Sequence, residues 1–368
     1  MDMTRGARVY ALREGVRVFR TGEELRFRKG VWSYNEAAVR LGGQDERATR
    51  FFSEVYDALV RAHEADADEI ALSVQASGEE TSAYCEVLDE LRRQMFLHDA
   101  RERDVARAVS ALLGGGLAGV EGYASSKVRP VLFFADSSYA REAAKKLASE
   151  ISLPLDVMDM EVARELAQAD LTTRTDAVGY AETLARLSRV FHNYSCVLGC
   201  VAAPNLSMLR NMNRLLVEAE KPLILGLIDG PFMSLLATLA TQSGCFECYE
   251  QRMLARLEDM TVYHQFVEAT ADGGGAAVAG APPFAPPLHL LTSAVISEGY
   301  LYATLSMLRL AGRIVNIYLP LLEIQVQDLL RVPYCPACGF ISKAQMNEMY
   351  TSSKRLVGEM LSRVQVEG

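Results

Sequence analysis

The residues best suited to chemistry are four cysteines arranged as two Cys-x-x-Cys pairs. The first pair is Cys245 and Cys248, and the second is Cys335 and Cys338, followed directly by Gly339. A pair at this spacing presents two thiolates from one tight turn, and two such pairs complete the tetrahedral shell that Zn²⁺ favours. Four cysteines leave no open position for water. We therefore expect a structural zinc site that fastens two remote segments of the chain.

Two other interpretations of these cysteines are two unrelated pairs or two disulfides. The opening residues, Met1–Gly6, lack the apolar stretch of a secretory signal, and disulfides are rare in cytosolic proteins, which favours zinc. The remaining cysteines, Cys85, Cys196 and Cys200, lie in apolar periodic segments, so we expect them to be buried as small hydrophobic side chains.

Composition excludes several classes of protein. The chain has 368 residues, half of them hydrophobic, which is enough for two domains with substantial cores. A net charge of −9 argues against a nucleic-acid-binding surface. The most apolar run, residues 222–239, is broken by Gly226, Asp229, Gly230 and Pro231, so we expect no membrane span. These features predict a soluble cytoplasmic protein.

The sequence gives little support for other catalytic residues. None of the five histidines shares a motif with a plausible nucleophile, and the chain has no Gly-x-Ser-x-Gly or His-Glu-x-x-His motif. Asp229-Gly230-Pro231 follows an apolar run, at a place where α/β folds often bind ligands, but the same residues form ordinary turns. We favour the turn and predict no catalytic residue.

The pattern of residues 1–100 predicts a small winged-helix-like domain. Residues 8–13, 16–19 and 24–28 alternate apolar and polar side chains, with Gly15 and Gly22 at the turns, which predicts a three-stranded meander. Helical patterns follow at 34–41, 47–64 and 79–97.

Residues 101–128 are predicted to form a linker, which consists of a helix and a glycine-rich turn at 114–119. These glycines resemble a phosphate-binding loop only superficially, because a dinucleotide fingerprint leaves a buried strand and opens a helix, whereas a helical stretch precedes this cluster.

Residues 129–368 are predicted to form an α/β domain with a parallel, doubly wound sheet. Strand patterns at 130–135, 153–158, 196–202 and 222–228 alternate with helical patterns at 139–151 and 206–218. After the first cysteine pair we expect a helix to residue 269, a Gly/Pro-rich crossover at 272–287 and a long helix at 290–310. A strand-rich segment at 314–330 then leads into the second pair, and a helix at 346–364 follows.

Together these elements resemble the ubiquitin-activating-enzyme-like (ThiF/MoeB-like) fold, which includes the adenylating enzymes of thiamin, molybdopterin and microcin C biosynthesis. The segments Gly244-Cys-Phe-Glu-Cys248, with Arg252, and Arg331-Val-Pro-Tyr-Cys-Pro-Ala-Cys-Gly339 look closest to one branch. That branch is the ocin-ThiF-like partner proteins of YcaO cyclodehydratases in thiazole/oxazole-modified peptide biosynthesis. The resemblance implies a Rossmann-like sheet, a structural zinc on the two cysteine pairs and an N-terminal winged-helix element that recognises a peptide.

The departures from the adenylating members concern the nucleotide site. Those members have Gly-x-Gly-x-x-Gly after the first strand, whereas the corresponding turn here, residues 135–140, has no glycine and includes Asp136. Where they have an Asp-Asn pair this chain has Pro204-Asn205, and Leu209 replaces the helical arginine, with Arg210 beside it. We therefore expect no ATP use at this site and no bound nucleotide cofactor.

The resemblance also implies where a peptide would bind. It would add a strand at the edge of the meander, around Leu25, Phe27 and Val31 of the third strand, facing the helix at 79–97. The alternative is that these residues only fill the core of the small domain.

The function implied is that of a non-catalytic scaffold. It would hold the leader of a ribosomal precursor peptide and present the peptide to a YcaO-type cyclodehydratase in azole biosynthesis. One alternative is an ATP-dependent adenylating enzyme that acts on a peptide through a divergent nucleotide site. Another is a structural subunit that docks to an enzyme without contacting peptide. By resemblance we also expect a homodimer formed through the large domain.

Overall fold

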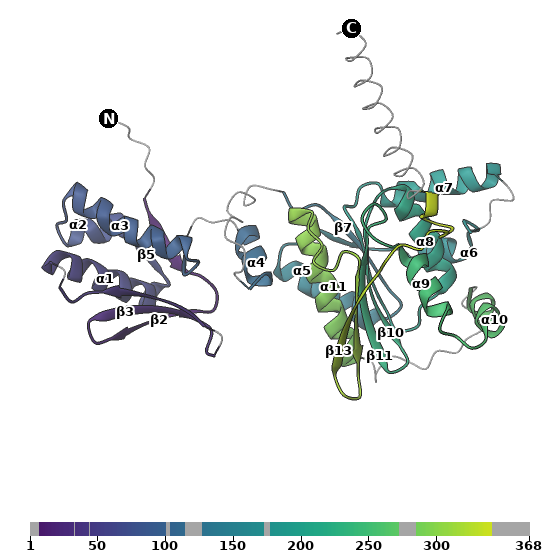
Figure 1. Cartoon of the computed structure of the whole chain (residues 1–368). Helices are drawn as coiled ribbons and strands as arrows, with labels where there is room; N and C mark the ends of the chain where they lie inside the picture. The colour runs from purple at the N-terminus through teal and green to yellow at the C-terminus, as the bar shows by residue number, and fades with distance from the viewer. Residues whose placement is uncertain are drawn as a thin grey trace, which may run out of the picture. The chain divides into compact units, whose positions relative to one another are not determined.

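The computed structural model describes residues 7–32, 34–43, 45–100, 104–114, 127–172, 177–271 and 285–340. The chain folds into two compact units, Met1–Ser126 and Lys127–Gly368, and each contains its own hydrophobic core. Figure 1 shows their helices and strands. Among the residues in these ranges, no helix combines the length and the apolar character that crossing a membrane requires.

The first unit contains two antiparallel three-stranded sheets. In one sheet β1 lies between β5 and β6, and in the other β3 lies between β2 and β4. Gly15 and Gly22 have positive φ angles at the predicted turns. The strands are β1 (Val9–Leu12), β2 (Val16–Thr21), β3 (Glu24–Lys29), β4 (Asn35–Arg40), β5 (Glu64–Asp66) and β6 (Leu97–Asp99).

The prediction for residues 8–41 is wrong in two respects. Its first strand, β1, belongs to the other sheet, and residues 34–41, predicted as a helix, contain β4. The alanines and charges of β4 favour a helix locally, but Ala37 and Val39 stand opposite Phe27 and Leu25 of β3. Burial of this alternate face against a neighbouring strand overrides the local preference.

Helices of the first unit cover the inner face of the meander. The core joins Leu25 and Phe27 to Phe51, Leu59 and Leu88. The helices are α1 (Glu46–Ala62), α2 (Ala67–Ser73), α3 (Gly78–Arg93) and α4 (Asp104–Leu112). A capping box starts α3, in which Ser77 and Glu80 each bond the other's backbone N–H. This capping box fixes where α3 begins.

The second unit is built on a seven-stranded sheet in the order β13-β12-β11-β10-β9-β7-β8. Its strands are β7 (Val131–Ala135), β8 (Leu155–Val157), β9 (Val197–Val201), β10 (Leu223–Asp229), β11 (Phe232–Thr238), β12 (Arg313–Tyr318) and β13 (Glu323–Asp328). Strands β8, β7, β9 and β10 pair in parallel, as predicted, whereas β10 to β13 pair antiparallel. The sheet is therefore mixed: its doubly wound parallel part was predicted, and the antiparallel strands β11 to β13 extend it.

Helices pack on both faces of the parallel half of this sheet (Figure 1). On one face lie α5 (Ser138–Glu150) and α11 (Ala285–Leu305). Helix α11 lies so close to β9 at Gly299 that a Cβ atom there would be 2.6 Å from Leu198 Cδ1, so a side chain at this position would have to displace Leu198. On the other face α8 packs against its helical neighbours. These helices are α6 (Met160–Gln168), α7 (Ala177–Phe191), α8 (Leu206–Glu218), α9 (Phe246–Leu254) and α10 (Met260–Ala271).

Two details of this unit differ from the sequence prediction. The single helix expected after the first cysteine pair is two helices, α9 and α10. Asp229-Gly230-Pro231 is the favoured turn, and it leads into β11, which the sequence did not predict. The predicted glycine cluster from residue 115, the crossover at 272–284 and the helix at 346–364 lie outside the described residues.

Candidate functional site

The two cysteine pairs meet at one buried point. The Sγ atoms of Cys245 and Cys335 lie 3.6 Å apart, and those of Cys248 and Cys338 lie 3.4 Å apart. Within the first pair the distance is 3.9 Å, and all four sulfur atoms lie within 4.8 Å of one another. All four cysteines are free and buried. The structure thus brings together four soft ligands from two remote segments, which can hold a metal ion.

The spacing of the sulfur atoms suits a tetrahedral ion. With metal–sulfur bonds of about 2.3 Å, a regular tetrahedron places its sulfur atoms about 3.8 Å apart. Without a cation, hydrogen bonds to the neighbouring thiols and burial raise the pKa of Cys245. A divalent cation would remove this penalty, because it binds each sulfur as a thiolate. The donor set, four thiolates in a closed site, fits structural Zn²⁺ and leaves no place for a reacting water.

Backbone contacts hold the two segments of the cluster together. The Gly244 N–H donates to Leu329 O at 3.1 Å, and a Cβ on Gly244 would lie only 2.9 Å from Leu330 O, so a side chain there would separate the segments. The Val332 N–H donates to Cys248 Sγ at 3.3 Å. An N–H donor to sulfur stabilises the thiolate form of Cys248, which is the form that binds a metal ion.

Helix α8 supports the cluster from the side through buried polar groups. Asn213 Nδ2 donates to Cys245 Sγ at 3.5 Å, and its Oδ1 accepts the Phe246 N–H at 3.0 Å. The neighbouring Arg214 forms a two-point ion pair with Glu247, and both side chains are less than a tenth exposed. Removing either charge would leave the other buried and cost about 3–5 kcal/mol. The sequence analysis did not identify these supporting residues.

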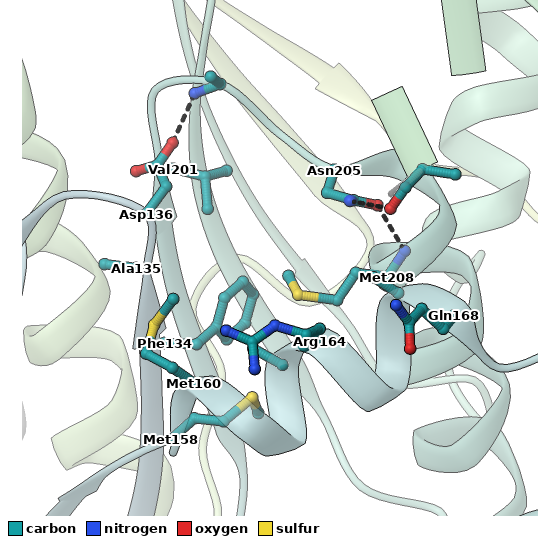
Figure 2. A pocket seen from close by; sticks show the side chains of 14 residues that line it. Phe134, Ala135, Asp136, Met158, Met160, Arg164, Gln168, Val201, Asn205 and Met208 are labelled. Atoms are coloured by element: carbon teal, nitrogen blue, oxygen red, sulfur yellow. Dashed lines mark hydrogen bonds between the residues drawn. The ribbon is translucent and has the colours of Figure 1, made fainter. Parts of the chain in front are cut away.

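A second candidate site is a pocket of about 420 Å³ at the carboxyl ends of the parallel strands. The chain order reverses between β7 and β9, which is where open α/β sheets bind ligands. Figure 2 shows Phe134, Met158, Met160, Arg164 and Met208 around this pocket. Sequence analysis missed Met160 and Arg164 because α6, which carries both, was not predicted. Thioether and aromatic groups make the pocket largely apolar.

Two of the polar side chains that line this pocket, Asp136 and Asn205, are engaged by the protein itself. Asp136 Oδ2 accepts the N–H groups of Ala202 and Ala203, at 2.8 and 2.6 Å. Asn205 caps α8 by accepting the Met208 N–H at 2.9 Å (Figure 2). A phosphate needs such amide donors and is repelled by a carboxylate. The Asp136 carboxylate is therefore unfavourable for a phosphate at this part of the rim.

Arg210, next to the position where the resemblance implied an arginine, is also engaged. Its Nε lies 3.0 and 2.9 Å from the two carboxylate oxygens of Glu250, and Tyr263 donates to the same carboxylate. Its guanidinium therefore supports the contact between α8 and α9. Met212, on the same helix, is fully buried in the core.

The structure separates the three residues predicted to bind peptide. Leu25 and Phe27 are only 1% and 2% exposed and lie in the core, which fits the alternative that they fill it. The strand that carries them, β3, is the central strand, so its prediction as an edge is wrong. Val31 lies beyond the end of β3 and is 54% exposed.

The edge of the meander nearest α3 is β4, and a groove of about 400 Å³ lies between them. In the described part of the chain β4 pairs with β3 alone. The groove has a small-residue and aliphatic floor with acidic and basic residues at its rim. Its lining residues are Ala37, Ala38, Val39, Ala83, Glu86, Val87, Glu90, Leu91, Arg93 and Gln94.

The other cysteines are confirmed as buried residues. Burial raises the pKa of Cys196 to about 12 and that of Cys200 to about 11. Both therefore stay protonated and unreactive at neutral pH.

No protein-family model and no curated protein sequence matches this chain. Among solved structures it is similar to the heterocyclase TruD, with a TM-score of 0.59 and 14% identity over 90% of this chain and 43% of that chain. A heterocyclase in complex with substrate and cofactor gives a TM-score of 0.58 and 15% identity over 90% of this chain and 40% of that one. The chain thus spans about two fifths of these heterocyclase chains.

A third solved structure, E. coli MccB with AMPCPP and MccA, has a TM-score of 0.46 and 12% identity over 90% of this chain and 100% of that chain. At these identities the likeness to the heterocyclases shows the fold alone. It shows that the chain shares its α/β fold with these heterocyclase chains, which agrees with the predicted Rossmann-like architecture.

The cysteine cluster generates a direct test. Cys335→Ser should lose most of the bound zinc and lower the melting temperature, because a loss of only about 4 kcal/mol shifts a unit of this size by about 8–16 °C. Elemental analysis and calorimetry measure the two effects. Cys85→Ala, which changes a buried cysteine elsewhere, should keep its zinc. A folded Cys335→Ser protein with a full complement of zinc would show that this cysteine is not a ligand.

Proposed function

We propose that this chain is a non-catalytic scaffold that binds the leader of a ribosomal precursor peptide. It would present that peptide to a partner modifying enzyme, a YcaO-type cyclodehydratase, during azole formation. The observation that carries the proposal is the groove beside the open edge of β4 in the first unit. The fold shared with two heterocyclase structures supports the same class of chemistry.

Strand addition is the binding mode that suits this groove. An edge strand offers a row of backbone N–H and C=O groups, so an extended peptide can pair with β4 as a fourth strand of the meander. Its alternate side chains would point into the groove, over Ala37, Val39 and Val87. The alanines leave room there for larger apolar side chains of a ligand. This mode replaces the β3 edge that the sequence suggested.

The same proposal assigns the cysteine cluster a structural role. A Zn²⁺ ion held by Cys245, Cys248, Cys335 and Cys338 would tie the end of β13 to the start of α9. Catalysis would belong to the partner enzyme. This division is consistent with the fact that the chain spans less than half of either heterocyclase.

The alternative is an ATP-dependent adenylating enzyme with a divergent nucleotide site. The pocket lies at the correct end of the sheet for it, but the turn at residues 135–140 has no glycine and carries the Asp136 carboxylate, which repels a phosphate. We therefore rank this activity second.

We also propose that two copies associate through the second unit. On the β12–β13 hairpin, Val315 and Ile317 stand opposite Val326 and Ile324. Ile324 and Val326 are 65% and 59% exposed, and neither carries a neighbouring lysine or arginine on β13. Alternating β-branched side chains form the kind of surface that packs against a second sheet, and a second copy supplies the same surface.

Leader binding is tested by filling the groove. Ala83→Arg places a long charged side chain over its floor and should weaken binding of the labelled leader by at least about tenfold, or 1.4 kcal/mol. Ser82→Arg changes the neighbouring exposed residue, which does not line the groove, and should bind like wild type. Fluorescence anisotropy measures both. Equal binding by the two variants, or no binding by wild type, contradicts the proposal.

Catalytic adenylation is tested by ATP–pyrophosphate exchange with the cognate precursor peptide. The engaged rim of the pocket predicts that labelled pyrophosphate is not incorporated into ATP above a protein-free control. Incorporation that depends on peptide would establish the adenylating alternative.

Association is tested by sedimentation velocity. Ile324→Lys should convert a dimer to a monomer, because it places a charge in the packed apolar face. Gln325→Lys lies on the opposite face of the same strand and should leave the dimer intact. Equal disruption by both changes would indicate edge-to-edge pairing of β13, and a monomeric wild type would exclude the dimer.

A further inference from the structure

The tip of the β3–β4 hairpin carries a cluster of exposed apolar side chains. Val31 is 54% exposed, Trp32 92% and Tyr34 55%. Trp32 is the only tryptophan in the chain. A tryptophan has the largest apolar surface of any side chain, and its exposure beside two other apolar residues is typical of a contact surface.

Arg28 of β3 holds this tip in place. Its Nη2 donates to Val31 O at 2.8 Å, and its guanidinium carbon lies 3.8 Å from the centre of the Tyr34 ring. A salt bridge of 3.2 Å from Nη1 to Glu36 Oε2 fixes the guanidinium itself. The side chain of one strand thus organises both the backbone and an aromatic ring of the tip. Because these side chains are already ordered, the tip loses less conformational entropy when a partner binds.

The tip also lies in line with the proposed peptide strand. Tyr34 directly precedes β4, which begins at Asn35. A strand that pairs along β4 and continues past Asn35 would therefore reach the tip. In either strand direction, one end of the paired segment arrives at Val31, Trp32 and Tyr34.

We propose that Trp32, with Val31 and Tyr34, is an anchor for an apolar side chain next to the part of the leader that pairs with β4. This inference rests on the proposed function, and it adds the chemistry of the flanking peptide position, which is aliphatic or aromatic. The groove sets the register of the pairing strand, and the tip selects the residue that follows it. A tryptophan that becomes buried when a partner binds is among the side chains that contribute most to the binding free energy.

The single tryptophan reports on the contact directly. The probe is the unlabelled synthetic leader of the precursor encoded nearest this gene, titrated into the full chain. Binding should shift Trp32 emission to shorter wavelength and protect it from acrylamide. Trp32→Ala should raise the dissociation constant by about tenfold. Trp32→Phe should recover most of that loss, because an aromatic ring is retained.

Tyr334→Ala is the matched control, since Tyr334 is an aromatic residue that is 88% exposed in the second unit. It should bind like wild type, and circular dichroism should show that all variants are folded. If wild type binds the leader while Trp32 emission and the affinity of Trp32→Ala stay unchanged, the tip assignment is wrong and the groove proposal stands. If wild type does not bind, both fail.

Discussion

The second unit depends on bringing four buried sulfur atoms to one point. Each cysteine is at most 4% exposed, and the two pairs come from opposite ends of the segment that contains α9 to β13. Four thiolates cannot share a dry site without a cation, and four thiols would forgo the ionic bonds that a metal offers. Gly244, Val332 and Asn213 are all arranged around this requirement.

Helix α8 contacts both the cysteine cluster and the rest of the second unit. One side of it carries Asn213 and Arg214 toward the cysteines and Glu247, while Asn211 bonds the carbonyls of Leu166 and Ala169 at the end of α6. Its first turn forms one wall of the pocket at the sheet edge. The same helix thus connects the metal-binding region to the place where related folds bind ligands. At this place Asp136 presents a carboxylate to the rim and Asn205 bonds the first turn of α8.

The sequence predicted features that depend on local chemistry and missed those that depend on pairing. The clustering of the four cysteines and the bounds of α8 follow from spacing and periodicity, and both agree with the structure. Strand β4 was missed because Ala37 and Ala38 favour a helix until β3 lies beside them. The resemblance placed Leu25 and Phe27 on an edge, because their strand was taken as the last of the meander while β4 was missed. Arg164 and the pocket depended on α6, which has only nine residues.

The distance along the chain between the two cysteine pairs has a consequence for biosynthesis. Cys245 and Cys335 are 90 positions apart, so at about 5–20 residues per second the ribosome needs roughly 5–18 s to deliver the second half of the site. During that interval the nascent chain displays two thiols without their partners. A metal ion held by all four sulfur atoms could therefore bind completely only after Cys338 has been made, late in the synthesis of the α/β unit.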